Sequence, residues 1–349
     1  LYCCLFPEDF RITKVFLIDY WICEGFLDEF KNTNRAQLQG FNIINCLLDA
    51  CLVERCDLVG ERVKMHDVIR DMALWVTREC EAPTKKFLVQ AGVGSIEEVL
   101  NAENWEGERM SLAHNGIEEL RATPTCPNVQ TLFLNNNKLK VVGNGFFQFM
   151  PNLRVLNLSE NQKLRELPKG ILELVSLELL DLRLTGIIEL PINLNMLSNL
   201  KCLNLRQTRN LSKIPRQLIC NLSRLQIFRI SFSEEGPDED NVLHGGNESL
   251  IEELECLPHL NFLSIELKTT SALQRFLSSH NLPGCTDLLL LRGFWESTEL
   301  NVLPLVNLER LDTLLISNFV SIKEIKMKIE GQIGEKRMTQ TSHCTSTPS

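Results

Sequence analysis

One hydrophobic pattern recurs through most of the second half of the chain. The spacing L-x-x-L-x-L-x-x-N-x-L is met by Val129, Leu132, Leu134, Asn137 and Leu139. Four further copies follow at intervals of 24, 24, 23 and 25 residues and begin at Leu153, Leu177, Leu200 and Leu225. A fixed period of this kind predicts a stack of similar short units.

Weaker copies extend the pattern over residues 110–330 and bring the number of repeats to about nine. They lie at Met110/Leu112/Asn115/Ile117, Leu260/Leu263/Ile265, Thr286/Leu289/Leu291 and Leu311/Leu314/Ile316. A period of about 20–29 residues is typical of leucine-rich repeats. In each copy the L-x-L core predicts a short strand with its leucines turned inward, because strand side chains alternate between faces. One repeat cannot bury its apolar side alone, so we expect a stacked solenoid, or horseshoe.

The remaining positions of each repeat predict how the chain leaves the strand. The ninth-position Asn is expected to form hydrogen bonds with backbone groups at the turn. Pro168, Pro191 and Pro215 recur in the second half of successive repeats. Because proline fixes φ and disfavours another strand, we expect a loop or short helix there, on the outer side.

Residues 1–92 lack the repeat and predict a small winged-helix-like α+β domain. Helices are expected over Val15–Leu27 and Arg35–Ala50, with a further helix start near Pro7. Cys51–Cys56 and Arg62–His66 predict two short strands around a turn at Gly60, and an amphipathic helix follows from Val68. The predicted fold class is therefore α/β, a leucine-rich-repeat solenoid preceded by this domain. Residues 93–109 are expected to form a linker and the N-terminal cap of the solenoid.

The junction Met65-His66-Asp67 lies where the predicted wing meets the last helix of this domain. Asp67 is expected to be the N-cap, accepting from otherwise unpaired N–H groups. His66 beside a helix N-terminus suits contact with an anion or phosphate, since N–H groups and the helix dipole favour negative charge. The alternative is a histidine that forms hydrogen bonds only within the junction.

Two segments break the pattern of apolar positions. Residues 233–247 contain five acidic residues, four turn-forming glycines and prolines, and no Lys or Arg, which predicts an acidic, mobile surface loop. Residues 331–349 are rich in Thr and Ser and have no periodicity, which predicts a disordered tail.

Composition and short motifs argue against several classes of function. The net charge of −9 argues against nucleic-acid binding, for which a basic patch is expected. No apolar run is long enough to predict a membrane span. The 13 cysteines form no C-x-x-C pair, and the five-residue spacing of Cys46, Cys51 and Cys56 does not fit a metal site, so no metal ligands are predicted. No H-E-x-x-H or G-x-S-x-G motif occurs, and no catalytic residues are predicted.

The outward positions of the repeat strands are the expected binding surface. A polar concave face of mixed charge suits recognition of a protein rather than small-molecule chemistry. The predicted partner-binding residues are Asn135, Asn157, Glu160, Asp181, Arg183, Asn204, Arg206, Arg229, Glu266 and Arg292.

Several segments also resemble one known family. LYCCLFPEDF (1–10), LIDYWICEGFL (17–27) and KMHDVIRDMALWV (64–76) resemble the end of the nucleotide-binding (NB-ARC) module of plant intracellular disease-resistance proteins, most closely the coiled-coil class. KFLVQAGVG (86–94) and ENWEGERMSLAHNGIEEL (103–120) resemble the stretch that joins that module to leucine-rich repeats. The resemblance covers roughly residues 1–325 and thus the C-terminal portion of such a protein.

This resemblance implies a non-enzymatic sensor in plant innate immunity, located in the cytoplasm or, through N-terminal parts outside this sequence, at the inner face of the plasma membrane. It implies that His66 contacts ADP, with Met65 and Asp67 shaping the switch junction. ADP or ATP is implied for a full-length parent only. No G-x-x-x-x-G-K-S/T loop occurs here, so this chain alone is expected to hold no cofactor.

The expected partners are a pathogen effector or guarded host protein and, within one molecule, the nucleotide-binding module that the repeats restrain. The alternative is a truncated repeat scaffold, decoy or adaptor, without signalling activity. An extracellular repeat receptor is a further alternative, favoured by four N-x-S sequons but not by any signal or membrane segment.

Overall fold

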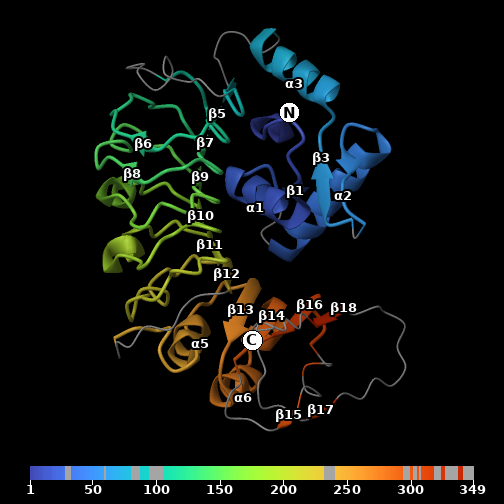
Figure 1. Ribbon diagram of the computed structural model, residues 1–349, viewed down its shortest axis with the longest axis vertical. Coiled ribbons are helices and arrows are strands. Elements are labelled where there is room, and N and C mark those ends of the chain that lie inside the picture. Colours follow the sequence, from blue (N-terminus) through green and yellow to red (C-terminus); the bar gives the residue numbers. More distant parts are fainter. Residues whose placement is uncertain are drawn as a thin grey trace, which may run out of the picture. The chain divides into compact units, whose positions relative to one another are not determined.

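The structure of the chain is a computed structural model, and its helices and strands follow the predicted order (Figure 1). Residues that the structure describes are 1–27, 33–58, 60–79, 87–93, 105–231, 240–293, 299–301, 305, 308–317, 324–326 and 337–340. The chain divides into two compact units, residues 1–187 with 196–204, and residues 188–195 with 205–349. Each unit is described by itself.

The first unit begins with the predicted winged-helix domain. After a 3-10 turn, η1 (Tyr2–Leu5), come strand β1 (Ile12–Thr13) and helices α1 (Lys14–Glu24) and α2 (Thr33–Asp49). Strands β2 (Glu54–Arg55) and β3 (Arg62–Lys64) form the wing, and α3 (Asp67–Glu79) follows. The sheet order is β1-β3-β2, with β3 antiparallel to both neighbours. Pro7 does not start a helix as expected, because residues 8–9 form a turn and Asp9 adopts a left-handed φ of 55°.

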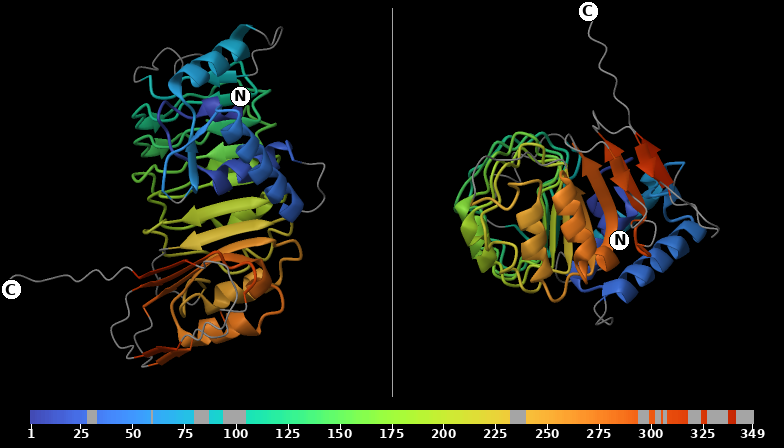
Figure 2. Two further views of the ribbon diagram at one scale, coloured as in Figure 1. Left: turned by 90° about the vertical axis from the view of Figure 1, so that its right-hand side faces the viewer. Right: turned by 90° about the horizontal axis from the view of Figure 1, so that it is seen from below.

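The second part of this unit is a parallel sheet with one strand per repeat (Figure 2). Its order is β4 (Phe87–Val89), β5 (Arg109–Ser111), β7 (Thr131–Phe133), β9 (Val155–Asn157) and β10 (Leu179–Asp181). Residues 202–204, which begin β11 (Cys202–Arg206), pair with β10. Because β4 pairs with β5, the solenoid sheet begins before residue 93, inside the stretch assigned to the winged-helix domain.

Short β6 (Glu119–Leu120), β8 (Val141–Val142) and the 3-10 turn η2 (Lys169–Glu173) form the outer side of these repeats. The turn η2 follows Pro168 directly, which confirms the expected short helix at one of the recurring prolines. A further 3-10 turn, η3 (Ile192–Met196), follows Pro191.

In the second unit the strand order is β12 (Ile227–Ser231), β13 (Phe262–Leu267), β14 (Thr286–Arg292), β16 (Thr313–Ser317) and β18 (Arg337–Gln340), all parallel. Here the outer side carries helices α5 (Glu248–Glu255), α6 (Thr270–Ser278) and α7 (Leu282–Cys285). A separate pair, β15 (Glu299–Asn301) and β17 (Glu324–Lys326), is also parallel.

Two sequence expectations in this unit are corrected. β18 lies inside the segment predicted to be disordered, and it pairs with the open edge of β16, whose backbone groups would otherwise remain unpaired. The acidic segment is not a mobile loop over residues 241–247, where Val242, Leu243 and Asn247 are fully buried. Asn241 Oδ1 there accepts from the Ile214 N–H, as a repeat asparagine does. Residues 232–239 lie outside the described part of the chain.

The core and turns of the repeats agree with the pattern in the sequence. The repeat leucines are buried except Leu260 and Leu314, which are half-buried, and every one of the nine predicted copies contains a strand. Asn137 Oδ1 accepts from the Asn115 and Ile117 N–H groups, and its Nδ2 donates to Leu112 and Leu134 carbonyls. Each ninth-position asparagine of this kind therefore joins its own repeat to the preceding one.

We expect Asn161→Ala to loosen the same joint one repeat further along. Asn161 accepts from the Leu139 N–H at 3.2 Å and donates to the Leu134 and Leu158 carbonyls at 3.0 and 2.8 Å. Leaving these buried groups unpaired should cost about 1–3 kcal/mol of unfolding free energy. Urea denaturation measures the loss, and hydrogen exchange at the Leu139 amide locates it.

The matched control is Asn152→Ala. Asn152 is exposed and has one bond, to the Pro127 carbonyl at 2.7 Å, so we expect a change within about 0.5 kcal/mol. Equal losses in the two variants would contradict a special role for the ninth-position asparagine.

Candidate functional site

One face of helix α1 contacts the concave strands of the first unit (Figure 1). This α1 contact face consists of Phe16, Tyr20, Cys23 and Glu24, which fall at the i, i+4, i+7 and i+8 positions of a helix and so share one side. The Tyr20 hydroxyl donates to Asp181 Oδ2 on β10 at 2.7 Å and accepts from Asn157 Nδ2 on β9 at 3.0 Å. All three residues are buried, so water cannot replace these bonds without separating α1 from the sheet.

Glu24 forms the second polar contact, at the C-terminal end of α1. Its Oε2 pairs with Arg109 of β5 at 2.9 Å, and its Oε1 accepts from the Thr131 hydroxyl of β7. Its backbone carbonyl accepts from Arg154 at 3.1 Å. Burial raises the pKa of the Glu24 carboxyl, and Arg109 opposes that shift. The buried carboxylate thus depends on its partners in the repeats.

Aromatic and cationic groups pack beside these two polar contacts. Phe133 of β7 lies 5.1, 5.2 and 6.0 Å, between ring centroids, from Tyr20, Phe6 and Tyr2. The Arg183 guanidinium lies over the Phe16 ring at 4.6 Å. Such ring and cation contacts are worth about 0.5–1.5 kcal/mol each, in addition to the apolar area they bury.

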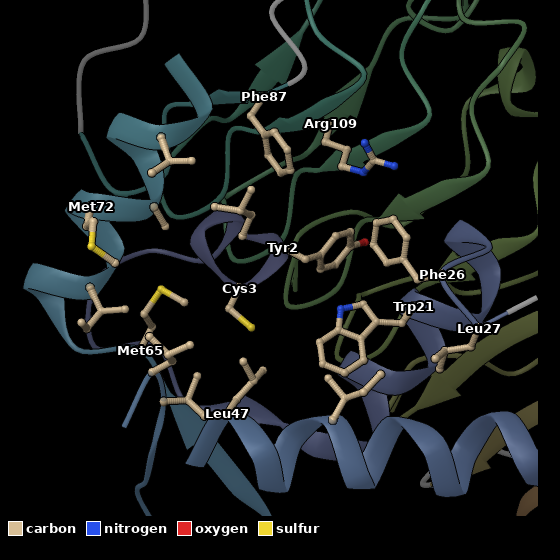
Figure 3. A pocket seen from close by; sticks show the side chains of 17 residues that line it. Tyr2, Cys3, Trp21, Phe26, Leu27, Leu47, Met65, Met72, Phe87 and Arg109 are labelled. Atoms are coloured by element: carbon tan, nitrogen blue, oxygen red, sulfur yellow. The ribbon is translucent and has the colours of Figure 1, made fainter. Parts of the chain in front are cut away.

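A cavity of about 570 Å³ lies beside this contact, within the winged-helix domain and against β4 and β5. Figure 3 shows Tyr2, Trp21, Phe26 and Phe87 around it, with Arg109 near the aromatic residues and Met65 and Met72 on another side. Its lining is mostly apolar, and only Tyr2, Trp21, Cys3 and Arg109 bring polar side-chain atoms. The cavity connects the α1 region to the predicted switch junction, because Met65 belongs to both.

The junction residues lie at the start of α3. Met65 is half-buried, whereas His66 and Asp67 are exposed. The His66 carbonyl accepts the first helical bond, from the Arg70 N–H at 2.9 Å, so His66 occupies the N-cap position. The expectation that Asp67 is the N-cap is therefore wrong by one residue. Asp67 lies in the first turn, where its charge is favourable to the helix dipole.

The His66 ring forms part of the local hydrogen bonding. Its Nδ1 accepts from the Val68 N–H at 3.4 Å, which is the bond that the alternative interpretation expected. A ring that accepts at Nδ1 carries its proton on Nε2 when neutral. No partner for Nε2 occurs among the described residues, so this N–H is available as a donor.

The predicted concave residues are less accessible than the sequence suggested. Six of them have exposed fractions of 3% or less: Asn135, Asn157, Asp181, Asn204, Arg229 and Glu266. Four are half-buried: Glu160, Arg183, Arg206 and Arg292. Asn157 and Asp181 are bonded to Tyr20, and three pairs form among or beside the others: Glu160–Arg183 at 3.4 Å, Arg229–Asp287 at 2.7 Å and Glu266–Arg292 at 2.5 Å. Six of the ten predicted residues are therefore buried within the chain, and partner binding by this set stays a prediction.

Four residues of this contact were not predicted from the sequence: Tyr20 and Glu24 of the winged-helix domain, and Arg109 and Thr131 of the repeats. A signal was present, because Asp19, Tyr20 and Glu24 interrupt a helix predicted to be buried, and buried polar groups need partners. What the sequence could not supply is which strands provide those partners.

Neither a metal site nor a membrane span was found in the described part of the chain. No group of three or more His, Cys, Asp or Glu residues there could hold a metal ion. Among the same residues, no helix has the length and apolar character needed to cross a membrane.

Comparison with known proteins identifies both parts of the chain. Residues 5–73 match the family model "Disease resistance protein Winged helix domain", and residues 116–329 match "Leucine-rich repeat region". The chain is 40% identical over 309 residues to "Disease resistance protein RFL1" of Arabidopsis thaliana, covering 88% of this chain and 33% of that protein. It is 41% identical over 318 residues to "Disease resistance protein SUMM2" of the same plant, covering 90% of this chain and 34% of that protein. It is 36% identical over 347 residues to "Disease resistance protein RPS5", also of that plant, covering 99% of this chain and 38% of that protein. The chain thus spans about a third of the length of these relatives.

We expect Tyr20 and Asp181 to be energetically coupled. Tyr20→Phe and Asp181→Asn should each lower the free energy of unfolding, because each leaves a buried polar group without its partner, at about 1–3 kcal/mol. The double variant should lose less than the sum, by a coupling energy of about 0.5–3 kcal/mol. Urea denaturation of the four proteins completes the cycle.

A second cycle controls for distance. Tyr20→Phe combined with Asn152→Ala, at an exposed site outside the contact, should be additive within about 0.5 kcal/mol. Additivity in the Tyr20–Asp181 cycle as well would show that the hydroxyl does not hold α1 on β10.

Proposed function

The chain belongs to the plant nucleotide-binding, leucine-rich-repeat (NB-ARC-LRR) disease-resistance proteins and matches their C-terminal portion, and on that premise we propose that it is the sensor and restraint of an innate immune receptor. In this proposal the repeats recognise a pathogen effector or a guarded host protein. They also hold the winged-helix domain, and with it an ADP-bound nucleotide module, in the resting state. The role is non-enzymatic and belongs in the cytoplasm.

The observation that carries the proposal is the buried contact between α1 and the repeats. Tyr20 and Glu24 contact four successive repeats of the solenoid, through Arg109, Thr131, Arg154, Asn157 and Asp181. Opening this contact would expose an ionised carboxylate, a guanidinium and a cluster of aromatic rings together. Since these groups are satisfied only in the docked arrangement, the contact favours one closed state over intermediate ones.

The geometry at α3 supports a phosphate contact by His66. An exposed imidazole with its proton on Nε2 can donate to a phosphate oxygen, and the N-terminus of a 13-residue helix favours a negative charge nearby. The carboxylate of Asp67 lies at the same helix end and stabilises its first turn. These residues fit ADP, which when bound would supply the negative charge that draws the winged-helix domain towards the nucleotide module.

Disrupting the α1 contact should remove the restraint. In a full-length receptor that contains the phosphate-binding loop, Tyr20→Phe together with Asp181→Asn is expected to cause ligand-independent cell death when expressed in leaves. The physical reason is that the closed state loses its central hydrogen bonds while the repeats keep their core. The measurement is leaf ion leakage at matched protein levels.

Arg121→Ala is the control, because it removes only an exposed ion pair with Glu119 at 2.6 Å, and such exposed pairs contribute little to stability. A silent Tyr20/Asp181 variant with normal protein levels would favour the alternative of a scaffold or decoy without a signalling role.

The junction should be sensitive in the same assay. Asp67→Val removes a charge that favours the N-terminus of α3 by about 0.3–1 kcal/mol and loosens the turn that positions His66. We expect autoactivity from Asp67→Val. Asp71→Val, which removes an exposed carboxylate one turn further along α3, should leave the receptor quiet. Equal activity of the two variants would argue that any loss of charge on α3 suffices.

A further inference from the structure

Two successive repeats carry basic residues on both sides of a buried leucine. The sequences are Lys138-Leu139-Lys140 and Lys163-Leu164-Arg165. The leucines have exposed fractions of 0% and 1%, and all four basic side chains are exposed. We name these four side chains, Lys138, Lys140, Lys163 and Arg165, the basic ridge.

The two parts of the ridge belong to neighbouring repeats that are hydrogen-bonded together. The Leu139 N–H donates to Asn161 Oδ1, and the Lys140 N–H donates to the Glu118 carbonyl of the preceding repeat. Lys140 Nζ lies 2.6 Å from the Glu118 carboxylate. Hydrogen bonding to Lys140 lowers the pKa of Glu118, and the charges of Lys163 and Lys138 lower it further, which places three lysines around one carboxylate.

Most of the positive charge of the ridge is not paired with an acidic side chain. Within the described residues, Lys140 alone among the four has an ion pair. Like charges held close to each other repel, so the ridge does not help the fold. Nor does the repeat require it, since the preceding copy has Gly116 and Glu118 at the equivalent positions. A local positive patch in a chain of net charge −9 therefore calls for an explanation outside folding.

The ridge also lies where a partner can reach it. The concave strands of these repeats are occupied by the α1 contact face. In contrast, β6 and β8, which precede and follow Lys138 and Lys140 in sequence, lie on the side of the solenoid away from α1 (Figure 1). A partner can thus contact the ridge without displacing the winged-helix domain.

We propose that the basic ridge is a docking surface for an acidic protein segment. The inference rests on the proposed function, because it gives a chemical class to the protein that the repeats recognise. Carboxylates from the partner would pair with Lys138, Lys163 and Arg165 and complete the arrangement that Glu118 begins. The carboxylates of Glu118, Glu119 and Glu166 interrupt the patch, whereas recognition of an anionic membrane uses uninterrupted basic clusters.

The test uses the full chain and a fluorescein-labelled oligoglutamate peptide at physiological salt. Fluorescence anisotropy should show binding that weakens with added salt. Lys138→Glu with Lys163→Glu should weaken it by at least about tenfold, a change of about 1.4 kcal/mol. Carbodiimide cross-linking followed by mass spectrometry should place the peptide on Lys138 and Lys163.

Arg11→Glu with Arg62→Glu is the matched control, since it makes the same change in net charge at two exposed residues of the winged-helix domain. Binding should persist in this variant. An equal loss in both variants, or cross-links spread over other lysines, would overturn the proposal, as would ridge-dependent binding of phosphatidylserine vesicles without peptide binding. These outcomes concern binding alone, so autoactivity of the Tyr20/Asp181 variant would still support the proposed restraint if the ridge fails.

Discussion

The stacking of repeats is the constraint from which the rest of the structure follows. No single repeat can bury its leucines or pair its strand, so each depends on its neighbour for both. Asn137 and Asn161 make this dependence explicit, because each binds backbone groups of two repeats at once. A parallel sheet built this way holds its outward side chains at fixed spacing, and that fixed spacing is what a helix such as α1 can match.

Helix α1 matches it with polar rather than purely apolar groups. An apolar helix could slide over the sheet at little cost, whereas the Tyr20 hydroxyl has to meet Asn157 and Asp181 together. Glu24 adds a second fixed point on Arg109 and Thr131. Two polar contacts at different points along a helix define its position and its direction. The contact therefore specifies one docked arrangement, at the cost of burying a carboxylate whose pKa is raised.

The solenoid was predictable because its signal is periodic. Every repeat has the same pattern of apolar positions. The nine copies of that pattern each predicted one strand of the solenoid sheet, from β5 to β16. The winged-helix elements were predictable from helical spacing, apart from β1, whose two residues give no periodic signal. The strand β18 was missed because Arg337–Gln340 has no leucine pattern and is ordered only by the edge it joins.

The site was less predictable, because it depends on contacts between segments more than a hundred residues apart. The concave asparagines and Asp181 were correctly identified as outward residues of their strands, but their neighbour is Tyr20, 161 residues before Asp181. No local pattern contains that pairing. The N-cap was misplaced for a smaller reason, since the choice between His66 and Asp67 is a matter of one residue at a helix end.

The α1 contact also limits which residues of the repeats can be substituted during evolution. Asn157 and Asp181 each serve a turn of their own repeat as well as Tyr20, so a substitution there disturbs both the solenoid and the winged-helix domain. Among the described residues, the side chains of Lys138 and Lys163 form neither a turn hydrogen bond nor a contact with Tyr20. Within three successive repeats, then, some positions are held by an internal partner while others are open to substitution. Substitutions in the second set can therefore change the outer surface of the solenoid without disturbing the contact between α1 and the repeats.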